Sequence, residues 1–128
     1  MKLPYFFTGI IVKGNQLGRT IGFPTANFLP ETGVEFPLKK GVYAVNARVR
    51  NNTYDGMANV GVRPTIGQNQ LIIEVHIFDF SEDIYGESMT VTFYKFIRDE
   101  RKFSGLESLK EQIEKDELMI KEFLSARM

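Results

Sequence analysis

The stretch GVYAVNARV, from Gly41 to Val49, decides the fold class of this 128-residue chain. Positions 43, 45, 47 and 49 are all apolar, whereas the alternate positions include Asn46 and Arg48. A repeat of two residues is the pattern of a β-strand whose faces meet different surroundings. Asn51-Asn52 can adopt the positive φ of a tight turn, so we expect residues 54–60 to return as the second arm of a hairpin.

Further segments continue this extended pattern on both sides of the hairpin. Glycine and proline punctuate the chain between them, and we expect loops at residues 31–40 and 61–67. Short strands joined in this way favour an antiparallel barrel or sandwich over a parallel sheet with crossover helices. The expected strands outside the hairpin are residues 6–13 (FFTGIIVK), 26–29, 71–80 (LIIEVHIFDF) and 89–97 (MTVTFYKFI), which gives roughly six strands in all.

The end of the chain changes to a helical period. Ser104 and Glu107 have the spacing of a capping box, which predicts a helix start. An apolar stripe follows at helical spacing, with Asp116 as its polar exception. We expect this helix to pack on the outside of the barrel or to close one end. The stripe consists of Leu106, Leu109, Ile113, Ile120 and Phe123 or Leu124.

Composition limits the class of protein. Hydrophobic residues make up 43% and charged residues 25%, as in ordinary globular proteins, and the length suits a single domain over residues 1–128. Sixteen acidic and sixteen basic residues balance, so net charge offers no argument for a nucleic-acid or membrane partner. There is no cysteine and one histidine, which excludes thiolate and multi-histidine metal sites. Any metal would be held by oxygen, and magnesium is the leading candidate.

Gly18 to Asn27 (GRTIGFPTAN) is the least regular stretch and reads as an ordered loop. Its glycine amides and Arg19 would suit a phosphate chain. From composition alone, a rigid structural crossover is the more common use of such a loop. Thr25 and Asn27 lie two apart, so their oxygens could complete a magnesium shell, or each could cap its own turn.

Glu74 stands in the middle of the most apolar expected strand. Period two places it on one face with Ile72, His76 and Phe78. A carboxylate is costly to bury without partners. It is therefore a general base tuned by its surroundings, one half of a salt bridge to Arg48 or Arg98, or part of a polar strand face that meets water.

The segment from Arg98 to Phe103 joins the last expected strand to the helix. Mixed charge with one aromatic residue is typical of a solvated connection, but a lid over a planar or anionic ligand would use the same residue types. Neither the Walker phosphate loop nor the Gly-x-Gly-x-x-Gly fingerprint occurs. Nucleotide binding, if present, therefore uses another architecture.

Taken together, the motifs resemble those of the riboflavin kinase (flavokinase) family. They follow one another in order over nearly the whole chain. The matching text is Gly9-x-x-x-x-Gly14, Gly18-Arg19-Thr20-x-Gly22-Phe23-Pro24-Thr25-Ala26-Asn27, Gly41-Val42-Tyr43, Asn59-Val60-Gly61-x-Arg63-Pro64-Thr65, Glu74-Val75-His76, Asp83-Ile84-Tyr85-Gly86-Glu87, Ile97-Arg98-x-Glu100-x-x-Phe103 and Leu106-Glu107-Ser108-Leu109.

The resemblance implies a mainly β fold, a six-stranded antiparallel Greek-key barrel with a C-terminal helix, in a cytoplasmic enzyme. It implies transfer of the γ-phosphoryl group of ATP to the 5′-hydroxyl of riboflavin, which gives FMN and ADP with magnesium. By position, Glu74 would be the general base. The implied ligand residues are Thr25 and Asn27 for magnesium and phosphates, Gly14 and Arg19 for the phosphate chain, Ile77, Asp79 and Tyr85 for adenosine, and Arg98, Arg101 and Ser108 for the flavin.

In many bacteria this module follows an adenylyltransferase domain in a bifunctional FAD synthetase. We favour such a fragment over a stand-alone kinase, and a monomer as the simplest state of a closed barrel. Two other classes compete with the enzyme. One is a barrel that binds flavin or nucleotide without catalysis, and the other is a small nucleic-acid-binding barrel, which the zero net charge disfavours.

Overall fold

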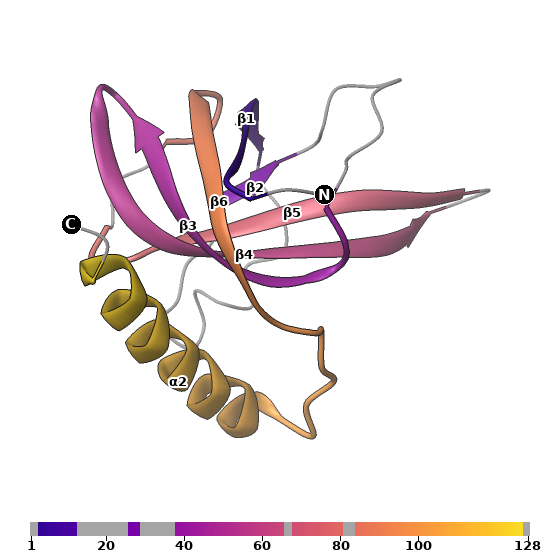
Figure 1. Ribbon diagram of the computed structural model, residues 1–128. Helices are drawn as coiled ribbons and strands as arrows, with labels where there is room; N and C mark the ends of the chain where they lie inside the picture. Colours follow the sequence, from indigo (N-terminus) through magenta and orange to yellow (C-terminus); the bar gives the residue numbers. More distant parts are fainter. Residues whose placement is uncertain (1–2, 13–25, 29–37, 66–67, 81–83, 127–128) are drawn as a thin grey trace.

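A computed structural model describes residues 3–12, 26–28, 38–65, 68–80 and 84–126. Within these residues the chain forms the strands β1 to β6 and one helix, α2 (Figure 1). The predicted mainly β, antiparallel architecture with a C-terminal helix is thus confirmed. The elements are β1 (Tyr5–Val12), β2 (Ala26–Phe28), β3 (Gly41–Val49), β4 (Asn52–Thr65), β5 (Gln68–Ile77), β6 (Ser88–Arg98) and α2 (Leu106–Ser125).

The strands are antiparallel neighbours in the order β1-β2-β5-β4-β3-β6, and β6 pairs back with β1 to close a barrel. The central hairpin is β3 and β4, whose ladder runs from Gly41 opposite Val60 to Val49 opposite Asn52. Positive φ angles of 52° at Arg50 and 65° at Asn51 make the turn. The turn therefore lies one residue before the predicted Asn51-Asn52 pair.

Alternation divides the strand side chains between two cores. The apolar residues at 43, 45, 47 and 49 of β3 point into the barrel together with Val60, Val75 and Phe93. The opposite side chains of β3 and β4, including Ala44 and Met57, pack against Ile120 and Leu124 of α2. Helix α2 consequently packs on the outside of the barrel, which is the first of the two predicted arrangements.

Two local predictions are wrong. The segment Gly61 to Thr65 was expected to be a loop, but it continues β4 because its backbone pairs with residues 68–72 of β5. Helix α2 begins after Gly105 without a side-chain cap, since the Ser104 hydroxyl lies 3.2 Å from the Ser108 hydroxyl instead.

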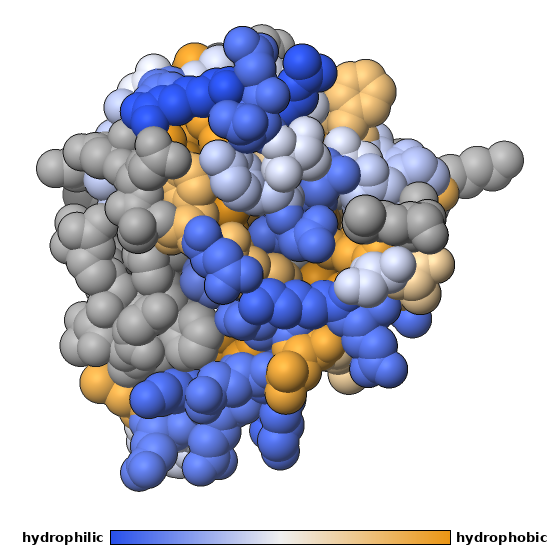
Figure 2. All heavy atoms as spheres, turned by 90° about the vertical axis from the view of Figure 1, so that its left-hand side faces the viewer, coloured by the Kyte–Doolittle hydropathy of each residue, from blue (hydrophilic) through white to orange (hydrophobic). Residues whose placement is uncertain are grey.

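The predicted helix stripe is largely confirmed. Asp116, Ile120 and Leu124 are its buried members, whereas Leu106 is 43% exposed. Hydrophilic side chains cover most of the described surface on the face shown in Figure 2. No helix within the described residues is long and apolar enough to cross a membrane.

Candidate active site

The candidate site is a row of side chains that crosses the outer face of the barrel. Glu74 on β5 is the direct cross-strand partner of Asn27 on β2 and of Asn59 on β4. The row continues to Val42 on β3, which is opposite Asn59, and to Arg98 at the end of β6. Directly opposed residues share one face of a sheet and have Cβ atoms about 5 Å apart, so the carboxylate is flanked by two amides.

The strand β5 has both faces covered, as predicted. Ile73 and Val75 are fully buried inside the barrel, and Ile72, His76 and Phe78 are buried on the outer side. Glu74 is the half-buried exception on that outer face. A carboxylate in such a position is partly shielded from bulk water without being fully enclosed.

The amides beside Glu74 carry unpaired polar atoms. Asn27 is 3% exposed, and neither its Oδ1 nor its Nδ2 has a hydrogen-bond partner among the described residues. The buried Oδ1 of Asn59 also has none within that part of the chain. Buried polar groups are nearly always hydrogen-bonded in native proteins, so these exceptions call for an explanation. A ligand would supply one, which makes the row the candidate site.

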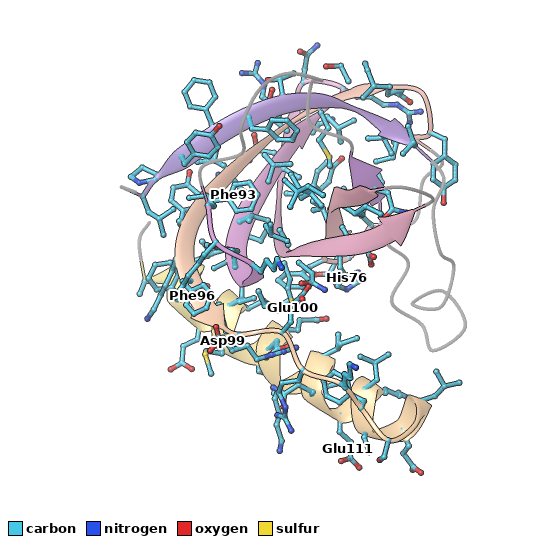
Figure 3. The ribbon with its side chains drawn as sticks, turned by 90° about the vertical axis from the view of Figure 1, so that its right-hand side faces the viewer. His76, Phe93, Phe96, Asp99, Glu100 and Glu111 are labelled. Carbon is cyan, nitrogen blue, oxygen red and sulfur yellow. The ribbon has the colours of Figure 1, made fainter. Side chains whose placement is uncertain are left out.

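The connection from Asp99 to Gly105 passes over the far end of the row. A Cβ built on Gly61 would lie 2.2 Å from Oε1 of Glu100, so the Glu100 carboxylate rests directly against that glycine. Gly61 shares the outer face of β4 with Asn59, two residues away. In Figure 3, Glu100 and His76 both lie on the side of the sheet that faces α2, whereas Glu111 points away from the sheet. The sequence motifs did not assign a role to Glu100 or to Asn59, although strand periodicity places Asn59 beside Glu74.

The predicted flavin residues Arg98 and Arg101 are held in one side-chain network. Arg98 donates from Nε to both oxygens of Asp116 at 3.1 Å and from Nη2 to Oδ2 at 2.8 Å. Gln112 donates to Asp116 at 2.9 Å and accepts from Arg101 at 2.6 Å. This network explains the polar exception in the helix stripe and fixes the connection against α2.

Both guanidinium groups also lie near the ring of Phe103, with centroid distances of 5.9 Å for Arg98 and 5.4 Å for Arg101. Asp116 holds the Arg98 guanidinium in a two-pronged contact, whereas a salt bridge from Arg98 to Glu74 was one of the alternatives for that carboxylate. The third predicted flavin residue, Ser108, is exposed at the start of α2.

The residues predicted for adenosine do not share one environment. The Ile77 side chain belongs to the barrel interior, and Tyr85 packs against the same core. Asp79 adopts a positive φ of 58° in the turn after β5, and its exposed carboxylate lies 3.3 Å from Nζ of Lys121. Lys121 also pairs with Glu117, and this hydrogen bond is the main reason that the pKa of Lys121 is raised.

Gly14, Arg19 and Thr25 lie outside the described residues, so their predicted roles remain predictions. No cluster of three or more histidine, aspartate or glutamate side chains suited to a metal occurs in the described residues. A magnesium ion here would depend on an amide oxygen, water and ligand oxygens, which is an ordinary coordination set for this ion. Asn27 fits that requirement because its buried Oδ1 is unpaired.

Comparison with known proteins identifies the family. The family model described as flavokinase, riboflavin kinase, matches residues 1–124, so the chain belongs to the riboflavin kinase family. The chain is 47% identical over 116 residues to the bifunctional riboflavin kinase/FMN adenylyltransferase of Bacillus subtilis, covering 88% of this chain and 36% of that protein. It is 48% identical over 124 residues to the Haemophilus influenzae protein of the same name, covering 96% and 40%. The chain thus spans well under half the length of these curated relatives.

Solved structures show the same fold. A chain from Streptococcus pneumoniae titled macrolide-efflux protein superposes with a TM-score of 0.85 at 39% identity, over 92% of this chain and 38% of that chain. Riboflavin kinase from Trypanosoma brucei superposes with a TM-score of 0.70 at 24% identity, over 95% and 78%.

Proposed function

We propose that this chain is an ATP:riboflavin 5′-phosphotransferase that produces FMN and ADP. The observation that carries the proposal is the outer-face row, in which Glu74 stands between two asparagines whose buried atoms have no partner among the described residues. Family membership supplies the substrate class, since the curated relatives are named as riboflavin kinases. The strand order supports the finer fold assignment of a six-stranded Greek-key barrel.

In the proposed reaction, Glu74 is the general base. Its carboxylate accepts the proton of the riboflavin 5′-hydroxyl as that oxygen bonds to the γ-phosphorus and the bond to the β-phosphate oxygen breaks, which releases ADP. Phosphoryl transfer depends mainly on positioning and charge neutralisation. A base held on a rigid strand with both faces packed satisfies the positioning requirement.

Asn27 would hold magnesium through its side-chain oxygen, together with Thr25. The ion supplies neutralisation of the phosphate charge when it is bound. Gly14 and Arg19 are proposed to bind the phosphate chain. Arg98, Arg101 and Ser108 are proposed to lie toward the flavin, and Ile77, Asp79 and Tyr85 toward adenosine. Because the Ile77 side chain is buried in the barrel, its contribution would come from the backbone.

The direct test is incubation of the purified chain with riboflavin, ATP and magnesium, followed by chromatography for FMN. FMN that accumulates with time and with ATP is the expected result. If the chain retains riboflavin but forms no FMN, it is a flavin-binding module rather than an enzyme. If it neither binds riboflavin nor forms FMN, the proposal is rejected.

We further propose that in its full-length context this module works beside an FMN adenylyltransferase, as in the bifunctional relatives. The chain as given should then form FMN but no FAD from riboflavin and ATP. Formation of FAD by this chain alone would contradict the division of labour.

A further inference from the structure

Asn59 has a side-chain oxygen for which the described residues supply no hydrogen bond. The residue lies on the outer face of β4, opposite Glu74 on one side and Val42 on the other. Along the same face of β4 its neighbours are Met57 and Gly61. Its Oδ1 is buried and has no hydrogen-bond partner among the described residues.

The described neighbours on this face cannot satisfy this oxygen. Valine, methionine and glycine side chains offer no donor, and an ionised carboxylate only accepts hydrogen bonds. The Asn59 amide nitrogen can therefore donate a hydrogen bond to Glu74, but the Asn59 oxygen cannot bond to that carboxylate. Glu100, which rests against Gly61, is likewise an acceptor when ionised. Because leaving a buried acceptor unpaired costs free energy, the donor is expected to come from a ligand.

We propose that Asn59 is a specificity-determining residue that accepts a hydrogen bond from the substrate hydroxyl next to the one phosphorylated. This inference rests on the proposed function, in which Glu74 receives the proton of the terminal hydroxyl of the ribityl chain. Asn59 is the cross-strand neighbour of Glu74, and hydroxyls on adjacent carbons are close together. The 4′-hydroxyl of riboflavin is thus placed to donate to Oδ1 while the 5′-hydroxyl meets the carboxylate.

A neutral amide suits this position better than a charged group. A carboxylate directly opposite Glu74 would repel it and would raise its pKa, because two adjacent acids resist double ionisation. The asparagine instead offers an acceptor to the substrate without opposing the ionised base. Asn27, on the other side of Glu74, remains available for the ion.

The test compares riboflavin with an analogue in which hydrogen replaces the 4′-hydroxyl. Wild-type protein is expected to prefer riboflavin by about tenfold or more in kcat/KM, the effect of one such hydrogen bond. Asn59→Ala should lower kcat/KM for riboflavin and abolish most of this preference. Asn46→Ala is the matched control, because Asn46 is a half-buried strand asparagine that donates to the Tyr94 hydroxyl at 2.8 Å, away from the row. This control should keep the preference.

Two further measurements exclude a merely structural role. Asn59→Ala removes an unpaired buried acceptor, so its melting temperature should equal or exceed that of wild type. In Asn59→Asp, the rise in rate that accompanies ionisation of the general base should occur at higher pH, because the added charge raises the Glu74 pKa.

Other outcomes overturn the inference. If Asn59→Ala keeps the wild-type preference for riboflavin, the hydroxyl contact does not exist. If it instead raises the magnesium concentration needed for half-maximal rate and leaves the preference intact, the partner of Asn59 is metal-bound water. If the wild-type chain makes no FMN, the proposed function itself fails. If it phosphorylates riboflavin and the analogue equally well, only the inference about Asn59 fails.

Discussion

At the scale of single residues, burial distinguishes two acidic side chains of this region, Asp116 and Glu74. Asp116 is 1% exposed and is satisfied by Arg98 and Gln112, so it stabilises the connection between β6 and α2. Glu74 is half-buried, and its direct cross-strand partners are two asparagines with unpaired atoms. The first arrangement is typical of a structural ion pair, whereas the second is the setting in which we propose the general base.

Asp116→Ala should therefore destabilise the protein strongly. It leaves the Arg98 guanidinium, which is 18% exposed, without its carboxylate, and such losses typically lower the free energy of unfolding by about 3 kcal/mol or more. Urea denaturation measures this change. Asp79→Ala is the control, because its carboxylate is 83% exposed and its pairing with Lys121 should contribute less than about 1 kcal/mol. An equal fall in the free energy of unfolding in the two variants would show that the buried Arg98–Asp116 pair stabilises the protein no more than the exposed pair does.

At the scale of elements, the hairpin was the most predictable part of the fold. The strand Gly41–Val49 matches its prediction residue for residue, because strict alternation has one structural solution when both faces are packed. The segment 61–65 was misassigned because glycine and proline signal turns locally, whereas pairing with β5 is a long-range effect. The capping box does not form for a different, local reason: the Ser104 hydroxyl pairs with the Ser108 hydroxyl, and Gly105 is the N-cap of the helix.

The site was predictable in part. Period two placed Glu74 correctly among apolar neighbours, and the family motif pointed to Asn27. The motifs that contain Asn59 and Glu100 predict no role for either residue, because the strand order brings Asn59 beside Glu74 and the connection brings Glu100 to Gly61. Strand periodicity does not predict which strands become neighbours, so these two contacts are evident only in the three-dimensional structure.

Two glycines of β4, Gly61 and Gly56, lie against different kinds of neighbour, and alanine substitutions at them should have different effects. Gly61→Ala places a methyl group against the end of the flexible Glu100 side chain, which can move away. Its stability should remain within about 1 kcal/mol of wild type, while kcat/KM for riboflavin falls because the connection is displaced. Denaturation and steady-state kinetics measure the two effects.

Gly56→Ala is the matched comparison. A Cβ there would lie 2.7 Å from the backbone oxygen of His76, which β-sheet pairing holds in place. We expect this variant to lose about 1–3 kcal/mol of stability, as overpacking does in ordered interiors. The reverse order of stabilities would contradict the placement of Glu100 on Gly61.

At the scale of the whole molecule, two groups of the described chain whose pKa is raised predict loss of stability in alkali. Burial raises the pKa of Tyr43 above its ordinary value of 10.0, and its hydroxyl donates to the Lys39 carbonyl at 2.6 Å. The hydrogen bond to Glu117 is the largest cause that raises the pKa of Lys121 above 10.5. In both cases the folded state retains the proton to higher pH than the unfolded state does. The associated stability is therefore complete below about pH 10 and is lost as the pH rises through the folded-state pKa.

Melting temperatures between pH 8 and pH 11 test this expectation. Wild type should lose stability above about pH 10, and Tyr43→Phe should show a shallower decline from a lower starting value, since the phenol and its hydrogen bond are gone. Lys121→Met should flatten the decline less, because that side chain is 38% exposed and its ion pairs are screened by solvent. Parallel curves for all three proteins would refute the assignment.

The most direct test of the central claim is the rate of FMN formation by Glu74→Gln. Glutamine keeps the shape of the side chain but cannot accept the hydroxyl proton as a carboxylate does. We predict that kcat falls by about 100-fold or more while ATP affinity and melting temperature stay close to wild type. Glu114→Gln, on the exposed side of α2, should leave all three unchanged. A Glu74→Gln protein with near-wild-type kcat would remove Glu74 from the role of base and contradict the proposed site.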